Sequence, residues 1–219
     1  GTQRLYRELR RVRRETEKPV VAWIGEVGAS GGYYISMAAD SVLALPGSIT
    51  GSIGVIMQFP NAGELLRKVG VEWQVVKSGE LKDLGSFARP LSEQERDVLR
   101  RLVDDAYGQF LEAVRSGRPL PADSLRALAD GRIFSGERAA RLGLVDRTGT
   151  LREAVSVAGR LAGLGARPDT VYPPEEKLSL VDLLTGVRTS RLSGMSSWLP
   201  DWVRKPAGAS RPELLYLWR

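Results

Sequence analysis

The sequence predicts an α/β domain, and three observations support this fold class. Short apolar runs that end in turn residues alternate along the chain with longer stretches whose apolar residues recur every three or four positions. The chain has 219 residues, of which 42% are hydrophobic, so it can build one ordinary domain with a real core. No apolar run reaches the roughly 18 residues of a transmembrane helix. Alternation of helix and strand, rather than separate blocks, favours α/β.

The first half of the chain begins with a helix and continues with short strands. Thr2 to Thr16 carries apolar residues at helical spacing among arginines, and Pro19 to Gly25 is a short apolar run typical of a buried strand. In the stretch 72–77, Trp73 and Val75 fall on one face of an expected strand. The other elements expected here are a strand over 41–45, a glycine-punctuated apolar run over 48–57, and helices over 33–39 and 62–69.

The second half is dominated by one long helix. Ser92 to Glu95 forms a capping box at its start, and Gly117 and Pro119 end it. Before this helix, the polar segment 78–90 is the part of the chain that packing explains least. The remaining elements are helices over 121–129 and 136–142, extended segments over 132–134 and 144–146, and a helix to about Leu161 that begins with a capping box at Thr150 to Glu153. We therefore expect one domain over residues 1–172 and a peripheral C-terminal extension over 173–219, which contains the apolar stretch 214–218.

Composition excludes several classes of active site. The chain contains no histidine and no cysteine, so Ser-His-Asp, Cys-His and histidine-ligated zinc sites are all impossible within it. No metal and no cofactor is expected, because no carboxylates occur at metal-ligand spacing. The net charge of +6 permits binding to nucleic acid, but the arginines of Thr2 to Thr16 are typical of a solvated helix face and no nucleic-acid motif accompanies them. We expect no nucleic-acid partner.

A candidate nucleophile lies between the first strand and the helix after it. Gly28 to Gly32 matches the G-x-S-x-G pattern of hydrolases, in which glycines permit a tight turn that holds Ser30 out of the strand. The amide of Gly31, at the start of the helix, would face a developing oxyanion. The pentapeptide alone is equally compatible with small residues that let a helix pack closely on a sheet.

Without histidine, the proton of a serine nucleophile must go to a lysine, a carboxylate or an amine elsewhere in the chain. An ordinary lysine has a pKa of about 10.4, so reaching about 7.5 requires roughly 4 kcal/mol of destabilisation of the charged form. Lys82 lies in the unexplained polar segment, and Lys77 is its serious rival. On the residues alone, Lys82 is also compatible with a loop lysine paired to Asp83. The remaining lysines lie in solvated or polar settings: Lys18, Lys68, Lys177 and Lys205.

A series of motifs in a fixed order resembles the signal peptide peptidase A family, the bacterial serine peptidases of peptidase family S49. The resemblance covers most of the chain. Its motifs are Lys18-Pro19-Val20-Val21, Gly28 to Ile35, Thr50 to Val55, Lys77-Ser78-Gly79 with Lys82-Asp83, Asp130-Gly131-Arg132 and Gly143 to Asp146.

The resemblance implies a fold and a site. The fold would be the Clp protease/crotonase-like spiral of β-β-α units, with 1–172 as the catalytic domain. Ser30 corresponds to the nucleophile, Lys82 to the general base, and Ser52 to the serine that hydrogen-bonds this lysine. The family's second oxyanion donor, in a Ser-Pro-Gly-Gly motif, is absent from this chain. We also predict a substrate groove lined by Tyr33, Ile53 and Gly54, although core packing is an alternative for Tyr33.

The resemblance further implies a setting. Members are membrane-anchored oligomers that digest signal peptides, which predicts a ring-like homo-oligomer at the bacterial cell membrane, with the catalytic domain on its extracytoplasmic side. The first strands and the membrane anchor are expected to be missing from this N-terminally truncated chain. Because Ser30 and Lys82 occur in one repeat, it resembles the short members, and we expect neighbouring subunits to complete the dyad.

Two other functions remain open at this stage. A crotonase-type acyl-CoA enzyme has the same fold and typically uses a glutamate, for which Glu26 is the nearest candidate. A non-enzymatic relative could keep the scaffold as an assembly module. Only the peptidase requires a reactive Ser30, so a serine-directed fluorophosphonate probe separates it from the other two.

Overall fold

The computed structural model describes residues 1–172 of the chain. The chain divides into two compact units, Gly1–Ala166 and Arg167–Arg219, and the first of these contains all the helices and strands named below. The predicted C-terminal extension over 173–219, including the apolar stretch 214–218, lies outside the described residues.

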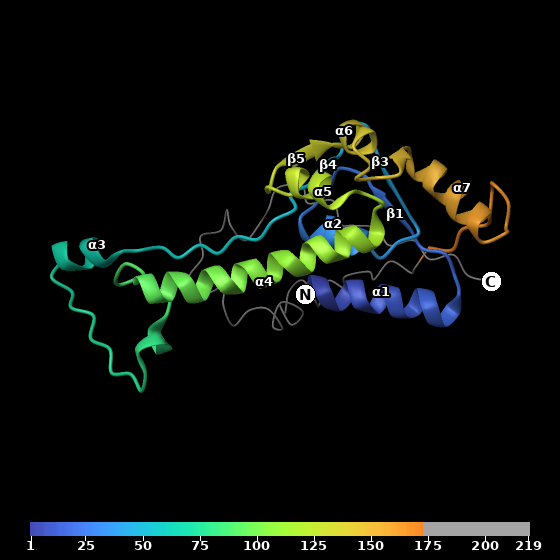
Figure 1. Ribbon diagram of the computed structural model, residues 1–219. Helices are drawn as coiled ribbons and strands as arrows, with labels where there is room; N and C mark the ends of the chain where they lie inside the picture. Colours follow the sequence, from blue (N-terminus) through green and yellow to red (C-terminus); the bar gives the residue numbers. More distant parts are fainter. Residues whose placement is uncertain (173–219) are drawn as a thin grey trace, which may run out of the picture. The chain divides into compact units, whose positions relative to one another are not determined.

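Two three-stranded sheets form the centre of the first unit (Figure 1). One has the order β1-β3-β6 with parallel pairing throughout. The other has the order β2-β4-β5, in which β2 and β4 are parallel and β4 and β5 are antiparallel. The strands are β1 (Val21–Ile24), β2 (Val27–Ala29), β3 (Ser41–Ala44), β4 (Ile49–Gly51), β5 (Ile133–Ser135) and β6 (Arg147–Thr148).

The order in which strands join the sheets reveals a repeat. β1 and β2 are followed by α2 (Gly31–Ser36), and the chain then returns with β3 and β4. β3 pairs with β1 and β4 pairs with β2, both in parallel, so the second β-β unit lies one turn after the first. The third turn differs, because its two strands enter in the opposite order and β5 is antiparallel. This topology confirms the predicted α/β class and the spiral of β-β-α units.

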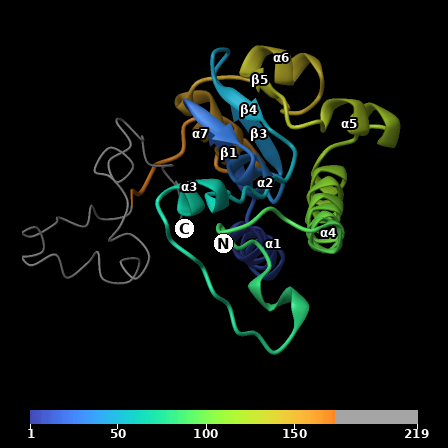
Figure 2. The ribbon, with the colours of Figure 1, turned by 90° about the vertical axis from the view of Figure 1, so that its left-hand side faces the viewer.

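Three helices form a layer against the sheets. α1 (Thr2–Thr16) has the predicted bounds. α2 packs against α1 and against α4 (Glu93–Gly117), the helix that Figure 2 shows nearly end-on. Aromatic rings connect them: the ring centroids of Tyr6 and Tyr34 are 5.1 Å apart, and those of Tyr34 and Phe110 are 4.9 Å apart. α2 is therefore fixed on both sides.

Helix starts follow the predicted capping signals. The side chain of Ser92 accepts a hydrogen bond from the Glu95 amide at the start of α4, and Thr150 and Glu153 form the same motif at α7. Both predicted capping boxes are confirmed. The other helices are α3 (Gly63–Lys68), the 3₁₀ helix η1 (Glu80–Asp83), α5 (Ala122–Leu128), α6 (Gly136–Arg141) and α7 (Leu151–Leu161).

Residues 56–90, here called the arm, run out along α4 to its N-terminal end and carry α3 and η1 (Figure 1). The predicted strand over 72–77 is wrong. Residues 71–80 are all exposed, and this segment pairs with no strand in the described part of the chain. The alternation of Trp73 and Val75 is present, but a β-strand needs a partner backbone, and the first unit offers none at this place.

Other boundaries also differ from the sequence expectation: α2 spans Gly31–Ser36 rather than 33–39, and the strand β2 (Val27–Ala29) was not predicted. In the run 48–57 only Ile49–Gly51 is a strand, because Gly51 and Ser52 both adopt positive φ and turn the chain away. In the segment 144–146, Leu144 and Val145 are buried in the core, and the strand begins afterwards at Arg147. No helix within residues 1–172 is both long and apolar enough to span a membrane.

Candidate active site

Ser30 occupies a strained turn between β2 and α2. Its φ of 50° and ψ of −114° form a conformation that residues with a Cβ rarely adopt. The turn is held because the Ser30 amide donates to the Gly51 carbonyl at 2.8 Å and its carbonyl accepts from the Tyr34 amide at 2.8 Å. Close packing also restricts Gly28, where a Cβ would lie 2.8 Å from the Ile24 side chain. The outcome is an exposed serine on a rigid support.

Ser52 lies directly beside this turn. The last register pair of β2 and β4 is Ala29 with Gly51, so Ser30 and Ser52 follow at the carboxyl ends of neighbouring parallel strands. Ser52 also has a positive φ, 51°, and its amide donates to the Arg132 carbonyl at 2.8 Å. The structure therefore brings two of the predicted site residues together.

The predicted oxyanion donor, Gly31, is the first residue of α2. An amide in the first turn of a helix has no acceptor within that helix, so it can bind an external oxygen. A Cβ at Gly31 would lie 2.9 Å from Thr2 Oγ1, which shows that the start of α1 lies beside the same turn.

The three residues predicted to line a substrate groove behave differently. Tyr33 and Ile53 have no exposed surface, so neither lines an open groove, and the prediction is corrected for both. Tyr33 is a core residue whose hydroxyl donates to the Leu144 carbonyl at 2.7 Å, and burial raises the pKa of its phenol. Gly54 is half-buried, and a Cβ there would meet the Gly131 backbone at 3.3 Å.

Lys82 projects from η1 in the arm and is exposed. Within residues 1–172 its ammonium makes no hydrogen bond or ion pair. It lines an open hollow of about 490 Å³ between η1 and the first turn of α4. The hollow is lined by Ser78, Gly79, Glu80, Leu81, Lys82 and Gln94.

Ser30 and Lys82 are associated with opposite ends of α4. α2 contacts the C-terminal half of this helix, through the ring of Phe110 and a close approach of Met37 to Gly117. The segment that carries Lys82 is bonded instead to Glu95 in the first turn. Fifteen residues separate Glu95 from Phe110, which is about 22 Å along a helix at roughly 1.5 Å per residue. One protomer alone does not bring Lys82 to Ser30.

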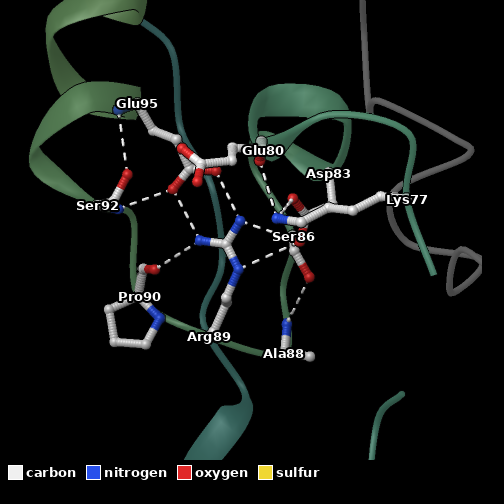
Figure 3. Close-up of polar contacts among 9 residues, drawn as sticks. All are labelled: Lys77, Glu80, Asp83, Ser86, Ala88, Arg89, Pro90, Ser92 and Glu95. Atoms are coloured by element: carbon white, nitrogen blue, oxygen red, sulfur yellow. Dashed lines mark hydrogen bonds and ion pairs between the residues drawn. The ribbon is translucent and has the colours of Figure 1, made fainter. Parts of the chain in front are cut away.

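A network of ion pairs holds the arm to α4 (Figure 3). Arg89 donates to both carboxylate oxygens of Glu95 at 2.7 Å and makes an ion pair with Asp83 at 3.0 Å. The Arg89 hydrogen bonds, with the Ser92 amide, lower the pKa of Glu95 to about 2. Hydrogen bonds from Lys77 and then Arg89 lower the pKa of the Asp83 carboxyl. The carboxylates of Glu95 and Asp83 therefore remain ionised at neutral pH.

The two candidate bases, Lys77 and Lys82, take different places relative to the same network. The Lys77 ammonium donates to Asp83 Oδ1 at 2.7 Å and to the Glu80 carbonyl at 2.8 Å. These contacts tie the Lys77 side chain to η1, so Lys77 holds this part of the arm in place. Lys82 makes no such contact in the described residues, so of these two lysines it remains the candidate general base.

Sequence reasoning missed Arg89 and gave Glu95 only a capping role. Their pairing could have been suspected from Arg89 three residues before the capping serine, Ser92, since this spacing lets a guanidinium reach the N3 carboxylate. The glutamate of the acyl-CoA alternative, Glu26, is exposed in the turn between β1 and β2. Within residues 1–172, no three carboxylates cluster closely enough to hold a metal ion.

Comparison with known proteins adds an independent line of evidence. The model of Peptidase family S49 matches residues 12–165. The chain is 44% identical over 185 residues to the "Putative protease" of Synechocystis sp., covering 84% of this chain and 66% of that protein. It is 41% identical over 137 residues to the "Putative signal peptide peptidase SppA" of Enterococcus faecium, covering 63% of this chain and 40% of that protein. The chain thus spans less than two thirds of each.

Among solved structures, the chain is similar to an enoyl-CoA hydratase/carnithine racemase from Magnetospirillum magneticum. The sequences are 18% identical, the TM-score is 0.36, and the match covers 90% of this chain and 54% of that one. A TM-score this low carries no argument. The fold class rests on the strand order of the two sheets.

Proposed function

Because this chain belongs to peptidase family S49, a family of serine peptidases, we propose that it cleaves peptide bonds with Ser30 as nucleophile and Lys82 as general base. The family match favours this function over the acyl-CoA enzyme that shares the fold. Ser52 and the Gly31 amide complete the proposed site.

The backbone of Ser30 is the observation that carries this proposal. A serine that only filled space beside a helix would not need a φ of 50° with a ψ of −114°. Such a conformation costs about 1–3 kcal/mol and persists where it serves a site. Here it presents an exposed hydroxyl at the end of a parallel strand, next to the start of a helix.

The proposed chemistry follows from these positions. Neutral Lys82 accepts the Ser30 proton as the hydroxyl oxygen attacks the peptide carbonyl, and the Gly31 amide donates to the oxyanion. The protonated lysine then gives its proton to the leaving amine, and water releases the acyl group from Ser30 by the same steps. Ser52 orients the lysine. In a Ser52→Ala variant, kcat/KM should be lower and the ionisation of the base displaced.

In our proposal Lys82 comes from a neighbouring subunit of a ring-like homo-oligomer. Lys82 lies at the far end of α4 from the Ser30 turn, and burial against another subunit would favour its neutral form. The arm also exposes an unusual amount of apolar surface, which is typical of an interface. Its exposed large apolar residues are Ile56, Met57, Phe59, Leu65, Val69, Val71, Trp73, Val75, Val76 and Phe87.

We further propose that the substrates are signal peptides and other unfolded apolar peptides, and that the enzyme works at the extracytoplasmic face of the bacterial membrane. The name of the Enterococcus faecium relative supports the substrate class. A site assembled from two subunits would admit extended chains more readily than folded proteins. The membrane location depends on the family resemblance alone.

The test combines two substitutions in the full-length protein. Ser30→Ala and Lys82→Arg should each lower kcat/KM for an apolar peptide by about 10⁴-fold, and Ser30→Ala should also abolish fluorophosphonate labelling. Arginine keeps the positive charge but does not deprotonate at working pH, so Lys82→Arg tests the base and not the charge. Lys77→Arg is the matched control, which should keep activity. Substantial hydrolysis by the Lys82→Arg enzyme would refute the assignment.

A further inference from the structure

Within residues 1–172, a network of ion pairs attaches the turn that carries Lys82 to the start of α4. Asp83, the last residue of η1, is held from two sides, by Lys77 at 2.7 Å and by Arg89 at 3.0 Å. Arg89 in turn forms a two-pronged contact with Glu95, both bonds being 2.7 Å long. Figure 3 shows this guanidinium between the two carboxylates.

The far end of this attachment is rigid because Glu95 is buried. Its carboxylate also accepts the Ser92 amide at 2.7 Å, and the Glu95 amide donates to the Ser92 hydroxyl at 3.2 Å. The residue is 1% exposed, whereas arginines paired on the outer face of the same helix, such as Arg115 with Glu112, are exposed at both ends. Surface pairs of that kind contribute little to stability, but a two-pronged contact with a buried carboxylate fixes the geometry of the arginine.

The contact fixes the backbone at Lys82 without using its ammonium. Successive residues of a 3₁₀ helix point about 120° apart, so the anchored Asp83 and the neighbouring Lys82 face different directions. Lys82 lines the hollow that it shares with Gln94 of α4. Because Asp83 is held, the position of the Lys82 backbone and the direction in which its side chain projects are also set.

We propose that Arg89 is a positioning residue for the general base: it clamps the Lys82 turn to the buried Glu95 and so sets where the amine meets the nucleophile. The inference rests on the proposed function of Lys82. Arg89 touches neither substrate nor the reacting atoms. Misplacement of a catalytic group by about 1 Å can lower a rate by about 100-fold, so the clamp matters for catalysis even where the fold tolerates its loss.

The decisive variant is Arg89→Lys in the full-length enzyme, since lysine keeps the charge but cannot make the two-pronged contact. We expect kcat to fall by about 100-fold with KM unchanged within about twofold, and the ionisation seen in kcat/KM to be displaced. Arg115→Lys, which changes an exposed arginine of α4, should match the parent in kcat, in KM and in the ionisation. If Arg89→Lys fails to fold, Asp83→Asn is the second variant. It removes the ion pair between Arg89 and the residue next to Lys82, and it should displace the same ionisation in the pH profile of kcat/KM.

The outcomes separate this proposal from the assignment of the base. If Lys82→Arg is active, the base assignment fails first. If Lys82→Arg is inactive but Arg89→Lys keeps the parental kcat and pH profile, the positioning role is overturned. The positioning role is also overturned if Arg89→Lys loses activity only in proportion to its loss of folded or assembled protein, while its pH profile stays that of the parent.

Discussion

The Ser30 turn and the Lys82 turn are both short polar turns that precede a helix, yet they are built in opposite ways. Ser30 is held by the ends of two parallel strands and stands against core residues, in a strained conformation that its own protomer maintains. Lys82 is held by ion pairs to one helix end, in an arm whose residues 71–80 are all exposed. The comparison teaches that one protomer by itself maintains the turn of the proposed nucleophile, whereas in our proposal the base needs a second subunit.

The largest expected effect is on activity, and it tests directly whether Ser30 and Lys82 of different subunits act together. Full-length Ser30→Ala and Lys82→Ala proteins are each inactive in our scheme, but subunit exchange between them should restore activity. With random exchange at equal amounts, about a quarter of the interfaces would pair an intact serine with an intact lysine. Peptide hydrolysis after mixing measures this fraction.

The control for exchange is a mixed oligomer detected with two different affinity tags. Exchange without any return of activity would mean that each dyad forms within one chain. The arm would then have to fold back over its own protomer.

A pair of glycine substitutions compares the body with the arm. At Gly136 a Cβ would lie 2.0 Å from the Leu45 carbonyl oxygen, whereas at Gly79, near Lys82, no heavy atom lies within 4 Å. Gly136→Ala should therefore lower the free energy of unfolding by about 3 kcal/mol, and Gly79→Ala should change it by less than about 0.5 kcal/mol. Denaturant unfolding of both variants measures the difference. Equal losses would show that the arm is packed as tightly as the body.

Acid should weaken the attachment of the arm. Because Arg89 lowers the pKa of Glu95 from 4.5 to about 2, the ionised carboxylate stabilises the folded state above pH 4.5, and this contribution is lost as the pH falls towards 2. The free energy of unfolding should thus decline over this range. A Glu95→Gln variant should be less stable at pH 6 and show a shallower decline.

The matched control is Glu112→Gln, which removes an exposed carboxylate from the same helix and should follow the parent. A Glu95→Gln variant with the parental slope would mean that this carboxylate does not couple to folding.

The smallest effect concerns the strain at Ser30. Glycine adopts a φ of 50° and a ψ of −114° far more easily than alanine does. Ser30→Gly should therefore be more stable than Ser30→Ala by about 1 kcal/mol, while neither hydrolyses peptide. Thermal unfolding of the two variants measures the difference. Equal stabilities would show that the turn relaxes when the hydroxyl is removed.

The local signals of the sequence were sufficient for much of the fold. Apolar periodicity gave α1 its bounds, and serine and threonine with a glutamate three residues later placed the starts of α4 and α7. The glycines around Ser30 indicated its turn. These features depend on contacts within a few residues, so the sequence by itself determined them.

Other features depended on residues far apart in the chain. The alternation in 72–77 predicted a strand, but strand formation needs a partner edge, and pairing is a tertiary property. The burial of Tyr33 and Ile53, and the placement of Ser52 beside Ser30, followed from the stacking of the β-β units. Tertiary structure also decided that Lys82 lies far from Ser30, since the length of α4 separates their attachments.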